Sequence, residues 1–105
     1  MKNPKQTEAQ ILLGKHLAEL GIFASSEYRF CERKWRFDWA SRELRIAFEC
    51  NGGKWSGGHR RGNAIEDEND KLNTATLMGW RVLQFTNEQI ESGRAKEFLK
   101  EWVRP

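Results

Sequence analysis

Two neighbouring segments, residues 34–40 and 44–51, each alternate apolar and polar side chains, which is typical of β-strands that bury one face. The polar stretch between them favours an antiparallel hairpin with its turn at Arg42-Glu43. This hairpin constrains the fold strongly, because other elements must cover its apolar face. The side chains of that face are Trp35, Phe37 and Trp39 in the first segment and Leu44, Ile46, Phe48 and Cys50 in the second.

Each of the two segments also carries one carboxylate on its polar face. With the turn at Arg42-Glu43, Asp38 lies opposite Ala47 and Glu49 lies one diagonal step away, roughly 7–8 Å between Cα atoms. This spacing leaves room for a cation between the carboxylates, so we expect a metal site there. The alternative is that both acids are ordinary solvent-facing residues of a sheet with one exposed face.

The charge of the chain is unevenly distributed around this acidic pair. The formal net charge is +3, but residues 28–62 contain nine Lys and Arg against four Asp and Glu. Residues 63–70 then contain four acids and no base. A basic segment beside an acidic site suits a polyanion, such as DNA, whose backbone approaches a metal. The alternative is a solvated basic surface without a ligand.

Length and composition predict one small folded domain that spans residues 1–105. The chain has no apolar run long enough to span a membrane and no signal-peptide core at its start, so we expect a cytoplasmic protein. Cys31 and Cys50 are widely spaced, which favours two reduced thiols over a disulfide or a zinc site.

The remaining elements follow from periodicity and capping signals. Thr7 with Gln10 predicts the start of a helix that ends before Gly21, and Thr86 with Gln89 predicts the start of a short helix. The order is α-β-β-β-α-β-α, an α/β domain with a central mixed sheet flanked by helices. The further predicted elements are strands 27–32 and 80–85 and helices 64–78 and 95–103.

Hydrolysis of a phosphodiester needs an activated water and compensation of the negative charge of the transition state, and divalent cations can supply both. Magnesium prefers hard oxygen ligands and keeps several waters. The side chains of Asp38 and Glu49 meet this preference, and the backbone carbonyl of Cys50 is the natural third ligand. We therefore expect Mg²⁺ as the cofactor, with Mn²⁺ as a substitute.

The order of these motifs resembles the PD-(D/E)XK nuclease superfamily, in particular small endonucleases similar to the very-short-patch repair enzyme of bacteria and phages. The resemblance covers roughly residues 7–92 and implies a restriction-endonuclease-like fold, magnesium, and cleavage of DNA in repair or recombination. It also implies that the cell is bacterial or phage-infected. The motifs that carry it are Arg36-Phe37-Asp38-Trp39, residues 44–53 with Glu49, Asp70-Lys71-Leu72-Asn73, and Gly79-Trp80-Arg81-Val82-Leu83-Gln84-Phe85-Thr86.

The chain departs from the superfamily pattern at Asn51, because the third catalytic position of that pattern is usually a lysine. An amide is neither a cation nor a base, although Asn51 could hold a water or a metal. Lys71 is the candidate for the missing cation, and Lys54 is the second choice. The alternative for Lys71 is a surface ion pair with Asp67, one helical turn earlier.

Related nucleases often place an acid of the first helix near the metal, so the resemblance suggests Glu8 as an outer metal ligand. An acid at a helix start also stabilises the helix dipole without any catalytic role. Glu68 is a similar candidate, because its side chain could point into the same pocket from the long helix.

A basic and glycine-rich stretch provides the candidate DNA contacts. Trp55 could stack on a base or pack in a small local core, and His59 could serve as a general acid or lie exposed. The chain could act as a homodimer or with a protein partner that supplies specificity. The residues that we expect to contact DNA are Arg33, Lys34, Arg36, Lys54, Trp55, His59, Arg60 and Arg61.

The sequence thus predicts a metal-dependent DNA endonuclease that hydrolyses phosphodiester bonds, either by nicking DNA or by structure-directed cleavage. A second hypothesis is a non-catalytic DNA-binding or assembly module on a nuclease fold, which the absence of lysine at position 51 supports. A third is a zinc protein, but its possible ligands lack the short paired spacing of zinc sites. These ligands would be His16, Cys31, Cys50 and His59.

Overall fold

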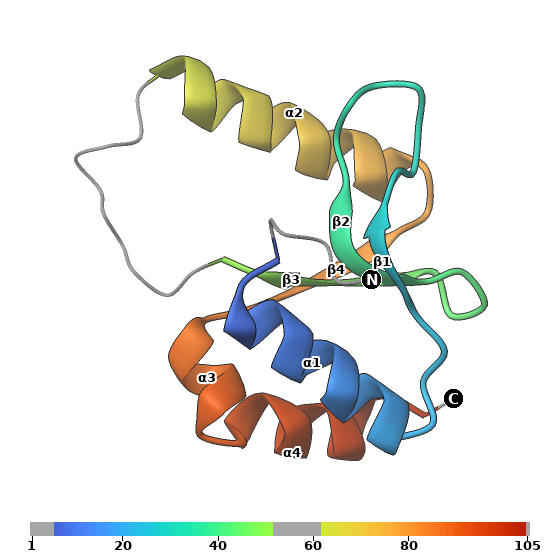
Figure 1. The fold of residues 1–105 in the computed structure, drawn as a ribbon. Helices are drawn as coiled ribbons and strands as arrows, with labels where there is room; N and C mark the ends of the chain where they lie inside the picture. Colours follow the sequence, from blue (N-terminus) through green and yellow to red (C-terminus); the bar gives the residue numbers. More distant parts are fainter. Residues whose placement is uncertain (1–5, 52–61, 105) are drawn as a thin grey trace.

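The computed structural model describes residues 6–51 and 62–104 as an α/β domain, which confirms the predicted fold class. Within these ranges, helices flank a mixed four-stranded sheet (Figure 1). The elements are α1 (Glu8–Glu19), β1 (Ser25–Tyr28), β2 (Phe37–Ser41), β3 (Ile46–Cys50), α2 (Gly62–Leu77), β4 (Arg81–Phe85), α3 (Asn87–Glu91) and α4 (Arg94–Trp102).

The sheet has three antiparallel strands and one parallel strand. Its order is β1-β2-β3-β4, in which β4 runs parallel to β3. A parallel neighbour requires a crossover, and α2 supplies it on one face of the sheet. Helices α1, α3 and α4 cover the opposite face (Figure 1). The result is a three-layer arrangement in which β3 lies in the interior of the sheet.

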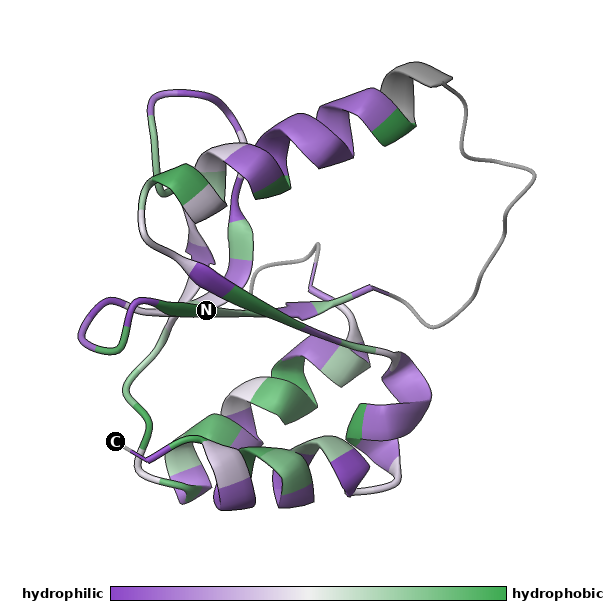
Figure 2. Ribbon diagram, turned by 180° about the vertical axis from the view of Figure 1, so that it is seen from behind, coloured by the Kyte–Doolittle hydropathy of each residue, from purple (hydrophilic) through white to green (hydrophobic). Residues whose placement is uncertain are grey.

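Two hydrophobic clusters occupy the two faces. Figure 2 shows that α2 is mostly hydrophilic, whereas α1 and α4 carry more apolar residues. The cluster between the sheet and α1, α3 and α4 includes Leu13, Leu17, Phe48, Ile90 and Leu99. The smaller cluster under α2 is largely aromatic and includes Phe30, Phe37, Ala47, Ala75 and Trp80.

The hairpin between β2 and β3 exists, but its predicted turn and register are wrong. The turn covers the four residues 42–45, and the strands pair Trp39 with Phe48 and Ala40 with Ala47. Continuing this register places Asp38 opposite Glu49 rather than opposite Ala47. The longer turn is stabilised because Ser41 Oγ accepts a hydrogen bond from the Leu44 N–H at 3.3 Å.

The far side of that turn is anchored by Arg45, which takes a positive φ of 56°. Its guanidinium lies 4.6 Å from the centroid of the Trp80 ring and donates to the carbonyl of Met78. These contacts join the turn to the end of α2, and the sequence pattern gave no sign of them.

The predicted strand 27–32 is also wrong in its bounds, because β1 covers Ser25–Tyr28 and the chain then leaves the sheet. Arg29 holds the connection to β2 in place by donating to two backbone carbonyls, Arg33 O at 2.9 Å and Glu32 O at 2.8 Å. The alternation that suggested a longer strand reflects Phe30, which packs under α2 from this loop.

The expected common face of Trp35, Phe37 and Trp39 is not observed. Trp35 precedes β2 and is half-buried, Phe37 is buried under α2, and Trp39 packs on the side of α1. Between the pairs Tyr28–Phe37 and Ser26–Trp39, Glu27 takes a positive φ of 51°. The strands kink at this point, so residues two positions apart no longer share a face. The second strand does follow its pattern, since Ile46 and Phe48 face α1 and Ala47 faces α2.

Both predicted capping boxes are confirmed. Thr7 and Gln10 exchange hydrogen bonds of 2.9 and 3.1 Å at the start of α1, and Thr86 and Gln89 do the same at 2.9 and 3.0 Å for α3. Gly21 takes φ 78° directly after α1, as expected for a helix end.

Within the described ranges, no helix combines the length and apolar character needed to cross a membrane.

Helix α1 approaches β2 closely at Gly14. A Cβ atom at this position would lie 2.2 Å from the nearest atom of the Trp39 indole. The same indole donates its Nε1–H to the backbone carbonyl of Gln10 at 2.8 Å. The absence of a side chain at Gly14 therefore lets Trp39 fix the position of α1 on the sheet.

We predict that Gly14→Ala lowers the free energy of unfolding by about 1–3 kcal/mol, the usual cost of overpacking. Alanine is the better helix former by roughly 1 kcal/mol, but the steric overlap outweighs that gain. Thermal or urea unfolding measures the effect. Trp39→Phe should remove part of the overlap, so the two changes together should cost less than their sum. Full additivity would contradict this account.

Candidate active site

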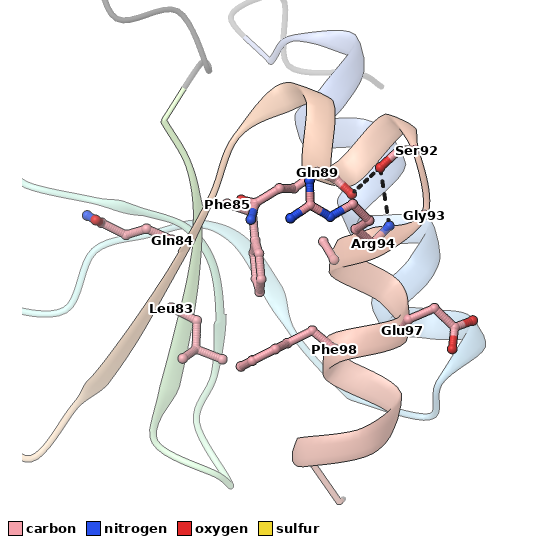
Figure 3. A pocket seen from close by; sticks show the side chains of 10 residues that line it. Leu83, Gln84, Phe85, Gln89, Ser92, Gly93, Arg94, Glu97 and Phe98 are labelled. Atoms are coloured by element: carbon pink, nitrogen blue, oxygen red, sulfur yellow. Dashed lines mark hydrogen bonds between the residues drawn. The ribbon is translucent and has the colours of Figure 1, made fainter.

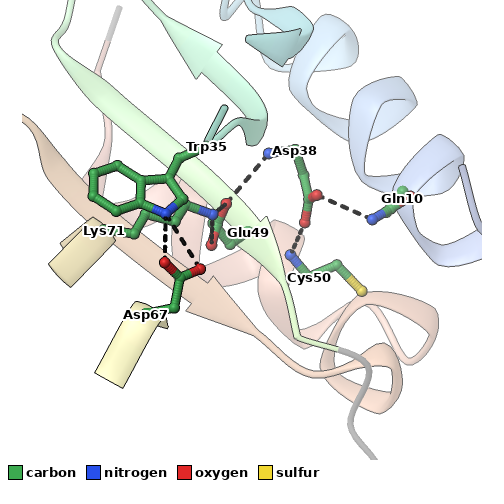
Figure 4. Close-up of polar contacts among 7 residues, drawn as sticks. All are labelled: Gln10, Trp35, Asp38, Glu49, Cys50, Asp67 and Lys71. Carbon is green, nitrogen blue, oxygen red and sulfur yellow. Dashed lines mark hydrogen bonds and ion pairs between the residues drawn. The ribbon is translucent and has the colours of Figure 1, made fainter. Parts of the chain in front are cut away.

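The acids Asp38 and Glu49 meet where the ladder between β2 and β3 ends, beyond the pair Trp39–Phe48. Asp38 Oδ2 accepts the Cys50 N–H at 2.8 Å, and Glu49 Oε2 accepts the Asp38 N–H at 3.3 Å (Figure 4). Each carboxylate thus takes a backbone hydrogen bond from the opposite strand. The strand geometry therefore holds the two acids next to each other.

The other partners of this carboxylate pair come from helices on opposite faces of the sheet. Gln10 of α1 reaches Asp38, and Lys71 of α2 reaches Glu49 (Figure 4). The expectation that both acids project from one polar face is therefore wrong in detail. The carboxylate of Asp38 faces Gln10 and the Cys50 N–H, while that of Glu49 points toward Lys71 on α2.

Burial sets the electrostatics of the pair. Glu49 is only 7% exposed and Asp38 is half-buried, which excludes the solvent-facing alternative for Glu49. Burial raises the pKa of Glu49, and the nearby Asp38 and Glu68 carboxylates raise it further, while Lys71 opposes the shift. Burial likewise raises the pKa of Asp38, against the hydrogen bond from Cys50, the charge of Lys71 and the hydrogen bond from Gln10.

Lys71 lies on the buried side of α2. Its Nζ is 3.0 and 3.2 Å from the two oxygens of Glu49 and 5.7 Å from the centroid of the Phe37 ring. The alternative of a surface pair with Asp67 is wrong, because Asp67 instead accepts the Trp35 Nε1–H at 3.2 and 3.3 Å. The structure thus brings together Asp38, Glu49 and Lys71 from three separate segments.

The sequence predicted Gln10 only as a helix-capping residue, and its place in the site was missed. Its Oε1 accepts the Thr7 N–H in the capping box, which turns its Nε2 toward Asp38 Oδ1 at a distance of 3.0 Å. The capping motif identified Gln10, but the fold alone shows that the free half of the amide faces the acidic pair. Glu8 is exposed in the first turn of α1, and its role as a metal ligand stays a prediction.

The remaining positions of the predicted site have distinct surroundings. Asn51 is exposed and donates its backbone N–H to the Phe85 carbonyl at 3.0 Å. The thiol of Cys50 is 2.8 Å from Asn87 Oδ1, which accepts its hydrogen. Glu68 is half-buried on α2 and close enough to raise the pKa of both Asp38 and Glu49.

The candidate DNA contacts divide into two groups. Arg33, Lys34 and Arg36 are exposed on the loop between β1 and β2, and the Arg33 guanidinium lies 4.2 Å from the centroid of the Trp35 ring. Because Trp35 is bound to Asp67, this basic loop is tied to the helix that carries Lys71. The other predicted contacts lie outside the described residues, namely Lys54, Trp55, His59, Arg60 and Arg61.

The described residues contain no group of three or more His, Cys, Asp or Glu side chains that could hold a metal. The zinc hypothesis therefore finds no support from His16, Cys31 and Cys50, while His59 lies outside the described ranges. Two carboxylates with a backbone carbonyl still match Mg²⁺, which is commonly held by one or two carboxylates and water. The Asp38 carboxylate also raises the pKa of Glu49 by repulsion, which a bound cation would relieve.

Comparison with known proteins finds a solved structure with a similar fold. No family model and no curated protein sequence matches the chain. Among solved structures, the chain is similar to the homing endonuclease I-Bth0305I catalytic domain, with a TM-score of 0.71 and 19% sequence identity. The similarity covers 93% of this chain and 96% of that one. The two proteins therefore share a fold over almost their whole length.

We predict that Lys71→Met raises the pKa of Glu49 further, because the mutation removes the cation that opposes the burial effect. When the pKa of a carboxyl is higher in the folded than in the unfolded state, the folded state binds the proton more tightly. The free energy of unfolding therefore falls as pH rises from the unfolded pKa to the folded pKa. The variant should therefore lose stability toward neutral pH, by about 3 kcal/mol for a broken buried pair. Carboxyl NMR and urea unfolding at several pH values measure both effects.

Two further variants test the cause of that loss. Lys71→Arg keeps the charge and should retain most of the stability, and Lys71→Met with Glu49→Gln should recover part of it by removing the unpaired acid. If Lys71→Met unfolds with unchanged pH dependence, the ion pair does not control the ionisation of Glu49.

Proposed function

We propose that this protein is a metal-dependent DNA endonuclease of the PD-(D/E)XK type, similar to the very-short-patch repair enzymes. The observation that supports this most is the carboxylate pair of half-buried Asp38 and buried Glu49, joined across two strand ends and faced by Lys71. The similarity in fold to an endonuclease catalytic domain agrees with the proposal. The substrate would be DNA, and the reaction would be hydrolysis of a phosphodiester bond in the cytoplasm.

Asp38, Glu49 and the Cys50 carbonyl would hold Mg²⁺, or Mn²⁺ in its place, with Glu8 as a candidate outer ligand. When bound, the metal would supply a water activated for attack and compensation of charge on the phosphate. The donor set fits this ion, because it consists of hard oxygen atoms on two mutually repelling carboxylates and a backbone carbonyl.

The surrounding residues would orient the carboxylates and stabilise charge. Gln10 and the Cys50 N–H each donate to a different oxygen of Asp38, which fixes the orientation of its carboxylate. Lys71 holds Glu49 and would place a positive charge beside the phosphate, the role that Asn51 cannot fill. The position of Lys71 at Glu49 weakens the main argument for a decayed, non-catalytic nuclease.

The basic loop between β1 and β2 would contact the DNA backbone through Arg33, Lys34 and Arg36. Contacts by residues 54–61 would add to this grip, with His59 as a candidate general acid. Phosphate contacts of this kind give affinity but carry little sequence information. Specificity would come from a second copy of the chain, a protein partner or an unusual DNA shape.

We predict that Asp38→Asn lowers the rate of Mg²⁺-dependent cleavage by at least about a hundredfold, while DNA binding is retained. The reason is that asparagine keeps the size of the side chain but removes one anionic metal ligand. Cleavage of supercoiled plasmid, single strands and a four-way junction, with and without Mg²⁺ or Mn²⁺, measures activity, and fluorescence anisotropy measures binding.

Asp70→Asn is the matched control, because Asp70 is an exposed acid on α2 outside the carboxylate pair, and it should leave cleavage unchanged. Wild-type protein that binds DNA but cleaves none of these substrates with either metal would contradict the enzyme and favour the DNA-binding module.

We also predict that Mn²⁺ binding weakens as pH falls, and that this loss begins at a pH above the usual pKa range of carboxyl groups. Protons compete with the metal, and burial raises the pKa of both Asp38 and Glu49. Gln10→Glu replaces the donor to Asp38 with a negative charge, so the loss should move to higher pH. Isothermal titration calorimetry across a pH series measures the shift.

Gln89→Glu is the control for this shift, because Gln89 occupies the equivalent position in the capping box of α3. This change should leave the pH dependence of metal binding as in the wild type. An equal shift in both variants would mean that helix capping, rather than the contact with Asp38, causes it.

A further inference from the structure

Strand β4 forms an edge of the sheet, and no strand of the described residues pairs with its outer side. Arg81 donates its N–H to the Arg45 carbonyl, and the Phe85 carbonyl accepts from Asn51, both at 3.0 Å, so the odd-numbered residues of β4 bond toward β3. Val82 and Gln84 therefore direct their backbone N–H and C=O groups outward. An open edge of this kind is a template for another strand.

This edge has a hollow on each face of the sheet. On the side of α4, a cavity of about 590 Å³ lies between Leu83, Phe85 and Phe98, and the Phe98 ring points toward Leu83 (Figure 3). On the side of α2, a cavity of about 440 Å³ is lined by residues that include Trp80 and Val82. Side chains on both faces of an added strand would find apolar surface.

Helix α4 continues the apolar surface beside this edge. Phe98 is 43% exposed and Trp102 is 68% exposed, although their ring centroids lie only 6.4 Å apart. Phe98 also packs on Phe85 at 5.9 Å between centroids, which joins the helix surface to β4. Exposed neighbouring aromatic residues on a small domain are typical of a contact surface.

Charged residues flank the aromatic pair on the same face of α4. Arg94, Phe98, Glu101 and Trp102 follow the i, i+4, i+7, i+8 spacing of one helix face. Arg94 and Glu101 are both exposed, and neither forms an ion pair with another described residue. If two such helices pack antiparallel about Phe98, Arg94 of each lies within one residue, about 1.5 Å along the axis, of the level of Glu101 of the other.

We propose that the chain forms a homodimer in which β4 pairs antiparallel with β4 of a second copy. The twofold axis passes between the two Leu83 residues and between the two Phe98 residues. Val82 of one copy then faces Gln84 of the other, so both outward backbone groups of each residue are satisfied. The two sheets become one continuous sheet, and the same surface serves both copies.

The charge arrangement identifies a second copy as the occupant. The backbone pairing places the twofold axis at Leu83, next to Phe98 of α4. The same axis brings Arg94 of one copy close to Glu101 of the other. A peptide strand from an unrelated protein would satisfy the edge of β4 but would leave this match on α4 unexplained. The inference does not depend on the proposed nuclease activity.

Charge reversal tests this arrangement. Arg94→Glu or Glu101→Arg alone creates like-charge contacts twice in the dimer, so each should raise the dissociation constant of the dimer about tenfold. The double variant restores opposite charges and should recover the wild-type value. Sedimentation equilibrium over a concentration series, at low ionic strength, measures the dissociation constants.

Trp102→Ser should also weaken the dimer, while Ile65→Ser should not, because Ile65 is 45% exposed and lies on α2, which covers the opposite face of the sheet from α4. Circular dichroism confirms that each variant is folded. A wild-type chain that stays monomeric at high concentration overturns the proposal. A double charge reversal that dimerises no better than the single changes overturns the antiparallel packing of α4. Neither result affects the test of cleavage by Asp38→Asn.

Discussion

The structure depends on an exchange of hydrogen bonds between side chains and backbone where β2 and β3 diverge. Asp38 and Glu49 each accept a backbone N–H from the other strand, beyond the last ladder pair. These bonds satisfy amide groups that the kink would otherwise leave buried without partners. The acids are therefore part of the sheet itself, and the contacts that hold the fold together also hold the candidate site.

This arrangement explains why a hydrophilic helix covers one face of the sheet. Lys71 of α2 compensates the charge of the buried Glu49, and Asp67, one turn earlier, binds the indole of Trp35. The helix thus contacts the sheet through an ion pair and a hydrogen bond as well as through Ala75 in the aromatic cluster. Asp67 and Lys71 lie one turn apart on α2, so the same helix contacts both the basic loop and the acidic pair.

Much of the site could be predicted because its signals are local. The alternation in β3 placed Ile46 and Phe48 on one face and Ala47 and Glu49 on the other, as observed. Lys71 stood out as a charged residue beside an apolar helix stripe. The turn and the shared face of Phe37 and Trp39 were wrong because two positive φ angles, at Glu27 and Arg45, change the register and the strand direction. No pattern in the sequence marks those residues, since neither is glycine or asparagine.

The sequence by itself determined the element types, the two capping boxes and the carboxylates that meet, because periodicity and capping act over a few residues. Tertiary structure decided the partners of those carboxylates. Gln10 and Lys71 are 28 and 22 residues away from the acids they contact, and they reach them from opposite faces of the sheet. Which side chain completes the site follows from the packing of α1 against Trp39 and of α2 over Phe37, and these contacts exist only once the layers have assembled.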